Sequence, residues 1–203
     1  MIISHKYKCV FIHIPKTAGS FVHELLFQLD GNCINYMIEK ECYMTGHLTF
    51  SDIKKVEFYE QIKNYTFFTT IRNPIDQLIS FYNSVYDVPD FKRRDIYYVI
   101  EYYKMSIYEY IVYDHDKNND PKIIKIPFEN LKSKLLDLFK KLDIDTSFTD
   151  IESFFNRKIN ASRNIILNKK MVEDDVEFKN RIMSNKCIMA DLYYYNLFLD
   201  NSR

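Results

Sequence analysis

Short hydrophobic runs and longer periodic stretches follow one another along this chain. The runs at residues 8–14 (KCVFIHI) and 65–71 (YTFFTTI) are brief and rich in β-branched or aromatic residues, which is typical of buried strands. A third such run lies at residues 122–127 (KIIKIP), and residues 32–38 indicate a shorter strand. We therefore predict strands at these four places.

Periodic apolar positions predict helices in the intervening segments. One apolar face follows the first strand, at Phe21, Val22, Leu25, Leu26 and Leu29, with the spacing of an α-helix. Further helices are predicted at residues 51–62 with Ser51 as the N-cap, from Asn73 onward, and at residues 96–113, 130–142 and 188–199. The helix after Asn73 has the clearest start, because Asn73 can cap it and Pro74 suits its first position.

Alternation of strands and helices favours right-handed crossovers and a mostly parallel sheet. We therefore predict an α/β fold with a mostly parallel central sheet and helices on both of its faces. At about 150 residues per domain, the 203 residues predict a single domain over residues 1–203.

Composition narrows the classes of function. The chain has 28 Lys and Arg residues and 28 Asp and Glu residues, so its formal net charge at pH 7 is zero, and general attraction to nucleic acid is not expected. No run approaches the ~18 apolar residues of a membrane span, and residues 1–8 lack the apolar stretch of a signal peptide. We expect neither a nucleic acid nor a membrane as partner.

The four cysteines, Cys9, Cys33, Cys42 and Cys187, lie far apart in the sequence. They form no CxxC pair and no cluster with histidine, so the spacing of a zinc site is missing. Scattered single cysteines are typical of reduced thiols in the cytosol. We therefore expect no metal site and a cytoplasmic location.

The segment after the first predicted strand has the residues of a phosphate-binding loop. Residues 14–20 (IPKTAGS) lie beyond the carboxyl end of a strand, where open parallel sheets bind ligands. Backbone N–H groups at a helix start can cradle an anion; Gly19 lets backbone approach it, Ser20 offers a hydroxyl and Lys16 a cation. Because Lys16 precedes the single glycine, the order is not that of a Walker loop. The alternative is an ordinary strand–turn–helix connection.

A second cation follows the strand at residues 65–71. Arg72 comes directly after it, and Ser80 lies about two turns into the next predicted helix. A guanidinium fork and a hydroxyl suit a phosphate monoester. Two anion sites on neighbouring strand ends predict one ligand with a phosphate at each end.

Together these motifs resemble those of sulfotransferases that use 3′-phosphoadenosine 5′-phosphosulfate (PAPS). Residues 11–20 (FIHIPKTAGS) are similar to the family's 5′-phosphosulfate loop, and residues 72–82 (RNPIDQLISFY) to its 3′-phosphate motif. Residues 126–131 (IPFENL) resemble a late strand–helix unit of the family, and residues 160–163 (NASR) a segment near the nucleotide in the carbohydrate-type branch. Asn73 and Phe128 depart from the usual acidic residue and Tyr, and the chain is short for the family.

The resemblance implies a P-loop-NTPase-like sulfotransferase fold and sulfuryl transfer from PAPS to a hydroxyl acceptor. The product would be adenosine 3′,5′-bisphosphate, and no metal would be required. The Pro-Lys-Thr-Ala-Gly loop and a Gly-His pair favour a carbohydrate acceptor, with a peptidyl tyrosine or a small metabolite as the alternative. The implied nucleotide-binding residues are Pro15, Lys16, Thr17, Ala18, Gly19, Ser20, Phe21, Arg72, Ser80, Ser162 and Arg163.

Lys16 and His47 are the catalytic candidates. Lys16 would stabilise charge on the leaving phosphate. His47 stands where the Gly-His pair of the carbohydrate-type branch carries the catalytic base, and a neutral imidazole suits proton abstraction. Gly46, before it, is one of only three glycines. Glu24 is the alternative base, and His13 is expected to support the site.

Two other classes of function share parts of the pattern. A metal-dependent kinase would need Mg²⁺ and carboxylates that hold it, but no predicted strand ends in an obvious acidic ligand. A non-catalytic nucleotide-binding relative would have no need of Lys16 and His47, which are both present. The sequence indicates no oligomeric state.

Overall fold

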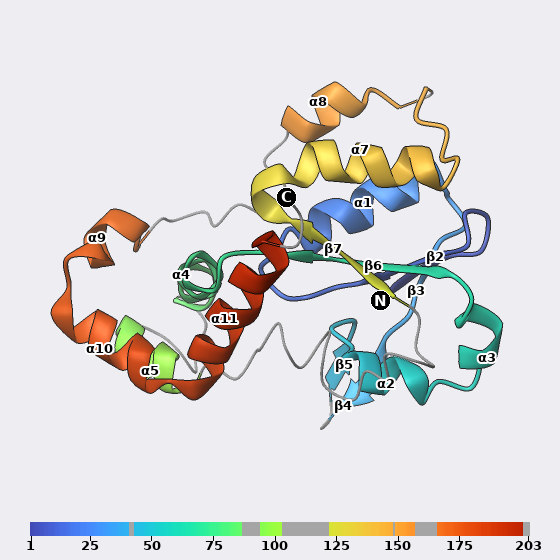
Figure 1. Ribbon diagram of the computed structural model, residues 1–203. Coiled ribbons are helices and arrows are strands. Elements are labelled where there is room, and N and C mark those ends of the chain that lie inside the picture. Colours follow the sequence, from blue (N-terminus) through green and yellow to red (C-terminus); the bar gives the residue numbers. More distant parts are fainter. Residues whose placement is uncertain (41–42, 87–93, 103–121, 148, 157–165, 201–203) are drawn as a thin grey trace. The chain divides into compact units, whose positions relative to one another are not determined.

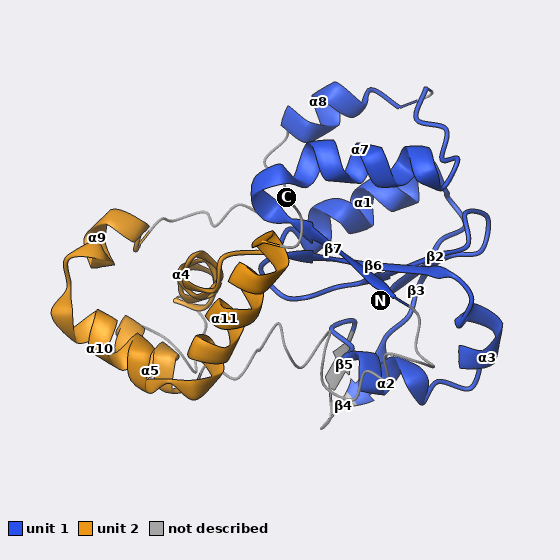
Figure 2. Cartoon of the chain, viewed as in Figure 1, with its two compact units in different colours: residues 1–71, 109–160 blue, residues 72–108, 161–203 orange. Residues whose placement is uncertain are grey.

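The computed structural model describes the chain in two compact units, each with its own hydrophobic core (Figures 1 and 2). Unit 1 comprises residues 1–71 and 109–160, and unit 2 comprises residues 72–108 and 161–203. The residues described are 1–40, 43–86, 94–102, 122–147, 149–156 and 166–200.

Unit 1 is built around a five-stranded sheet with the strand order β3-β1-β2-β6-β7. Three strands are parallel, namely β2 (Cys9–Ile12), β6 (Thr66–Ile71) and β7 (Ile123–Pro127). The strands β1 (Ile2–Ser4) and β3 (Ile34–Asn35) pair antiparallel at one edge. The α/β class is confirmed, and so are the strands predicted at residues 8–14, 65–71 and 122–127.

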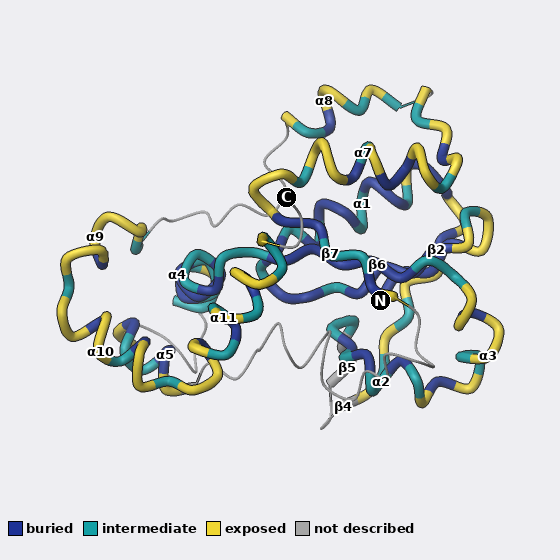
Figure 3. Tube along the Cα trace, viewed as in Figure 1, coloured by how far each residue is buried: buried dark blue, intermediate teal, exposed yellow. Residues whose placement is uncertain are grey.

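Helices cover both faces of the unit 1 sheet (Figure 1). On one face lie α1 (Gly19–Leu29), α7 (Leu131–Lys141) and α8 (Ile151–Asn156), and on the other α2 (Phe50–Lys54). Because side chains alternate along a strand, Phe68 packs in the core formed with α1 and α7, whereas Phe67 meets Phe50 of α2, with ring centroids 5.7 Å apart. All three rings are fully buried, and the central strands are buried along most of their length (Figure 3).

The segment after the first helix differs from the prediction. Instead of one strand at residues 32–38, it forms the two-residue β3 and then β4 (Ile38–Lys40), which pairs antiparallel with β5 (Tyr43–Thr45) in a second, small sheet. The single helix predicted at residues 51–62 is two short helices, α2 and α3 (Tyr59–Ile62).

The predicted cap of the first of these helices is also wrong. Thr49, not Ser51, is the N-cap of α2: its hydroxyl accepts the Asp52 N–H at 3.1 Å, and the Asp52 carboxylate accepts the Thr49 N–H at 2.8 Å. This reciprocal pair is a capping box, which satisfies two N–H groups at once. Ser51 alone would satisfy one.

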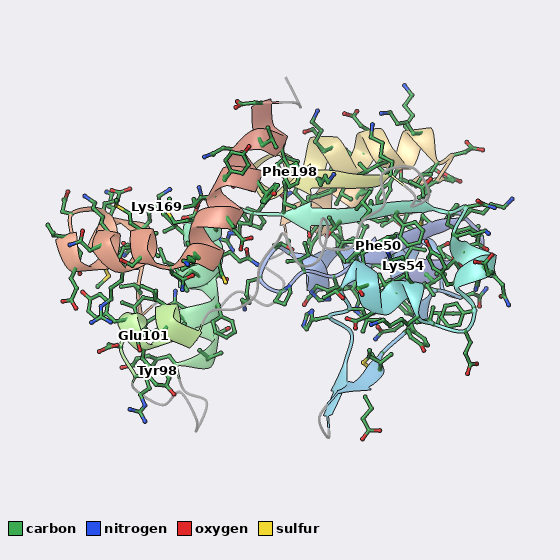
Figure 4. All side chains as sticks on the ribbon, turned by 60° about the horizontal axis from the view of Figure 1, so that its bottom comes forward. Phe50, Lys54, Tyr98, Glu101, Lys169 and Phe198 are labelled. Atoms are coloured by element: carbon green, nitrogen blue, oxygen red, sulfur yellow. The ribbon has the colours of Figure 1, made fainter. Side chains whose placement is uncertain are left out.

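Unit 2 is helical in its described part. Its core lies among α4 (Pro74–Val85), α5 (Ile96–Tyr102), α10 (Val176–Ser184) and α11 (Lys186–Asp200), and α9 (Lys169–Glu173) precedes α10. At its surface Glu101, labelled in Figure 4, accepts a hydrogen bond from Arg181 at 2.7 Å. The helix predicted at residues 96–113 is confirmed as far as Tyr102, and the remainder falls outside the described residues.

The last strand of the unit 1 sheet is followed by two helical segments. A short 3-10 helix, η2 (Phe128–Asn130), connects β7 to α7.

Among the described residues no helix has the length and apolar character needed to cross a membrane.

Candidate active site

A hydrogen bond between two threonines joins the predicted phosphate loop to β6. Since β2 and β6 are parallel neighbours, the loop after β2 starts at the sheet edge where β6 ends. The buried Thr17 hydroxyl donates to the Ile14 carbonyl at 2.8 Å, and its oxygen lies 2.9 Å from the Thr70 hydroxyl. Because the Thr17 proton is already donated, Thr70 is the donor in this second contact. Thr70 was not predicted, although a polar residue near the end of an apolar strand could have indicated it.

Replacing Thr17 with Val is expected to lower the free energy of unfolding by about 1–3 kcal/mol. The buried Ile14 carbonyl and Thr70 hydroxyl would each lose a partner, while the volume of the side chain would hardly change. Urea unfolding followed by circular dichroism measures this loss. Ser84→Ala is the control, because the exposed Ser84 hydroxyl also donates to a carbonyl, that of Phe81 at 2.7 Å. Equal stability of the two variants would contradict the role of Thr17.

The predicted phosphate loop leads into α1, whose N-terminus has no side-chain cap. Lys16 and Ala18 have left-handed backbone, with φ of 63° and 74°, and Ala18 is the N-cap residue of α1. Alanine has no side chain that could cap, and the first turn of α1 carries no acidic residue. Backbone N–H groups in such a turn favour an anion, and the helix dipole adds to this. The local backbone therefore suits the predicted phosphate.

Gly19 makes room for a histidine. Its φ is not positive, so the glycine is not needed for an unusual backbone. A Cβ at this position would lie 1.8 Å from Cδ2 and 2.0 Å from Nε2 of His13. The absence of a side chain therefore lets the His13 imidazole pack directly on the start of α1. Close approach of a ligand to Gly19 stays a prediction.

His47 lies beside this loop and is held by it. Its Nδ1 donates to the backbone carbonyl of His13 at 3.1 Å, and the two imidazoles meet edge to face with centroids 4.4 Å apart. A carbonyl can only accept, so Nδ1 carries the proton of the neutral ring and Nε2 carries the lone pair. The Nε2 atom is therefore the one that can take a proton.

The surroundings of His47 keep it uncharged. Burial is the main cause that lowers the pKa of His47 below its ordinary value of 6.5, and the charges of the N-terminal amine and, last, of Lys16 act in the same direction. The hydrogen bond to the His13 carbonyl opposes this shift. A group with a lowered pKa is deprotonated at pH 7, and a base must be in that form to accept a proton.

The second motif is built differently. As predicted, Asn73 caps α4: its side-chain oxygen accepts the N–H groups of Ile75 at 3.0 Å and Asp76 at 3.4 Å, and Pro74 is the first helical residue. The cap occupies N–H groups that could otherwise hold an anion. Phosphate binding here would therefore depend on the side chains of Arg72 and Ser80, which are both partly exposed.

The other predicted site residues have mixed positions. Phe21 is buried, with its ring 4.9 Å from that of Phe154 and 5.0 Å from that of Phe155, so its side chain supports α1 from within the core. Glu24 lies partly buried on the same helix. Ser162 and Arg163 fall outside the described residues.

The cysteines are free thiols where the structure describes them. Cys9 and Cys33 are buried and Cys187 is exposed. Burial raises the pKa of Cys9 and of Cys33 to about 12, so both are unreactive thiols at neutral pH. In the described part of the chain no group of three or more His, Cys, Asp or Glu residues could hold a metal ion.

Comparison with protein families places this geometry in context. A family model described as "Sulfotransferase family" matches residues 1–189, a range that contains the loop after β2, His47, Arg72 and Ser80. The comparisons with curated proteins and with solved structures gave no match. Because the family match runs over nearly the whole chain, this protein belongs to the sulfotransferase family.

Proposed function

We propose that this chain transfers a sulfuryl group from PAPS to a hydroxyl group, with a carbohydrate as the leading class of acceptor. The observation that carries the proposal is the place of His47: its neutral imidazole donates the Nδ1 proton to the carbonyl of His13, directly before the loop that contains Lys16 and leads into α1. Family membership supports sulfuryl transfer in general. A peptidyl tyrosine or a small metabolite is the alternative acceptor.

In this proposal the donor is held by the residues of the two motifs. Residues 15–21 bind its 5′-phosphosulfate, Arg72 and Ser80 bind its 3′-phosphate, and Ser162 and Arg163 complete the nucleotide site. The open start of α1 and the pairing preference of a guanidinium fork for phosphate support this assignment. Since the family match runs through both units, we propose one sulfotransferase domain. The free thiols of Cys9 and Cys33 support a cytoplasmic location.

The residues have complementary tasks in the transfer. Nε2 of His47 accepts the proton of the acceptor hydroxyl as that oxygen forms its bond to sulfur. The bond between sulfur and the bridging oxygen of the 5′-phosphate breaks, and this oxygen keeps the electron pair. Lys16 and the N–H groups at the start of α1 stabilise the charge that develops there. No metal ion is required for these steps.

A transfer assay with ³⁵S-labelled PAPS tests the proposal. Desulfated glycans, a tyrosine peptide and simple phenols serve as acceptors, each with and without EDTA. We expect label on the glycans and undiminished transfer in EDTA, whereas a kinase would move phosphate from ATP and stop when Mg²⁺ is removed. Binding of adenosine 3′,5′-bisphosphate without transfer to any acceptor would instead identify a non-catalytic relative.

A further inference from the structure

The imidazole of His13 touches both the start of α1 and His47. On one side it fills the space over Gly19, where a Cβ would lie 1.8 Å from its Cδ2 atom. On another side it meets the His47 ring at a centroid distance of 4.4 Å and an interplanar angle of 71°. Its own face stacks on Phe11, 5.9 Å away between centroids. The ring is thus fixed by its neighbours on β2 and α1.

His13 holds His47 through two separate contacts. Its backbone carbonyl accepts the Nδ1 proton of His47 at 3.1 Å, which determines the nitrogen that carries the lone pair. Its side chain limits the plane in which the His47 ring can lie. The carbonyl group remains after any substitution of the side chain, whereas the ring is lost. The two effects can therefore be separated by mutation.

His13 is poorly suited to take the proton itself. Burial is the main cause that lowers its pKa from 6.5 to about 3, and the neighbouring His47 adds to the shift. A group with so low a pKa stays neutral throughout the working range of pH and is a weak base. A neutral ring also places no positive charge against His47. Its contribution must come from packing.

We propose that His13 is a positioning residue whose ring, packed against Gly19, keeps the His47 imidazole in the orientation in which its Nδ1 proton reaches the His13 carbonyl. The role in turnover rests on the proposed function of His47 as base, whereas the orientation of His47 can be measured in the resting protein. The proposal also explains the glycine at position 19, because any side chain there would displace the His13 ring.

His13→Ala removes the ring and leaves the carbonyl. We expect kcat to fall about 10- to 100-fold, since small misplacement of a catalytic group has effects of this size, with KM for PAPS changed by less than about threefold. Without the ring, His47 can turn away from the carbonyl, so by ¹⁵N NMR its Nδ1–H tautomer should lose population. The pKa of His47 should rise toward its ordinary value as water replaces the ring. His5→Ala is the control, because the exposed His5 also has an edge contact, to Tyr65 at 5.7 Å.

Gly19→Ala tests the contact between the His13 ring and Gly19 by a change on α1. Alone it should weaken binding of adenosine 3′,5′-bisphosphate, because the new methyl group forces apart His13 and the start of α1. In the double variant with His13→Ala the methyl group occupies vacated space, so folding and nucleotide binding should recover while kcat stays low. Such recovery is a coupling that independent sites do not show. The double variant also fills the cavity that could destabilise His13→Ala.

The outcomes separate this proposal from the proposed function. Suppose that the wild type transfers sulfate. If His13→Ala and the double variant then have the wild-type kcat and the wild-type tautomer of His47, the positioning role is wrong. If the wild type transfers nothing, the proposed function fails, and the NMR comparison alone decides whether His13 orients His47. An unchanged His47 tautomer and pKa in His13→Ala would overturn the inference in that case too.

Discussion

Lys16→Ala is expected to lower kcat about 10²- to 10³-fold, the usual effect of removing one donor that stabilises a developing anion. Binding of adenosine 3′,5′-bisphosphate should weaken much less, because the N–H groups at the start of α1 remain. The substitution isolates the ammonium, since Lys16 has left-handed backbone at φ 63° and alanine carries the same backbone cost. Steady-state kinetics with labelled PAPS and calorimetry with the bisphosphate measure the two effects.

Lys8 offers a matched control for this change. It is an exposed lysine, also with left-handed backbone, at φ 49°, in the turn between β1 and β2. Lys8→Ala should therefore leave both kcat and nucleotide affinity at the wild-type level. Normal turnover in Lys16→Ala would contradict the catalytic role, and weaker nucleotide binding with an unchanged kcat would show that Lys16 acts in binding only.

His47→Ala is expected to reduce kcat about 10²- to 10⁴-fold, the contribution of a positioned general base. In the wild type, kcat/KM should rise as the pH increases through the pKa of His47 and stay constant above it. This pKa should lie below 6.5, because burial favours the neutral imidazole. The rate should fall as the pH drops through that pKa, since the protonated ring cannot accept a proton. In His47→Ala this ionisation should disappear from the pH profile.

The alternative base provides the comparison for His47. Glu24 lies on α1, and Glu24→Gln keeps the size of the side chain while removing its basicity. We expect this variant to retain the ionisation and most of the activity. If Glu24→Gln loses the ionisation and His47→Ala retains it, Glu24 is the base and the assignment of His47 is wrong.

Elements with strong local patterns could be predicted from the sequence. The central strands and the start of α4 are examples, because continuous apolar runs and the Asn73–Pro74 pair act within a few residues. The antiparallel strand β1 was missed, since its three residues become a strand only by pairing with β2 and β3. The capping box of Thr49 and Asp52 is present in the sequence, but a hydroxyl alone does not show which residue caps, and the prediction of Ser51 was wrong.

The site could be predicted only in part. The motifs indicated Lys16 and His47, but the contact of Thr17 with Thr70 and the packing of His13 on Gly19 depend on how the chain folds back on itself. Packing requires a glycine at position 19, where a Cβ would meet His13, but not at position 46. At Gly46 a Cβ would meet nothing closer than 3.6 Å, and φ is not positive, so neither packing nor backbone demands glycine there.

Calorimetry with two related nucleotides tests the central claim that Arg72 and the loop after β2 bind opposite ends of the same donor. Adenosine 3′,5′-bisphosphate should bind the wild type, and either removal of its 3′-phosphate or Arg72→Ala should weaken binding about 10- to 100-fold, as expected for hydrogen bonds to a charged group. The two changes together should cost little more than one alone, because each removes the same contact. Absence of binding heat with the bisphosphate, or an Arg72→Ala effect that is equally large for adenosine 5′-phosphate, would contradict this account.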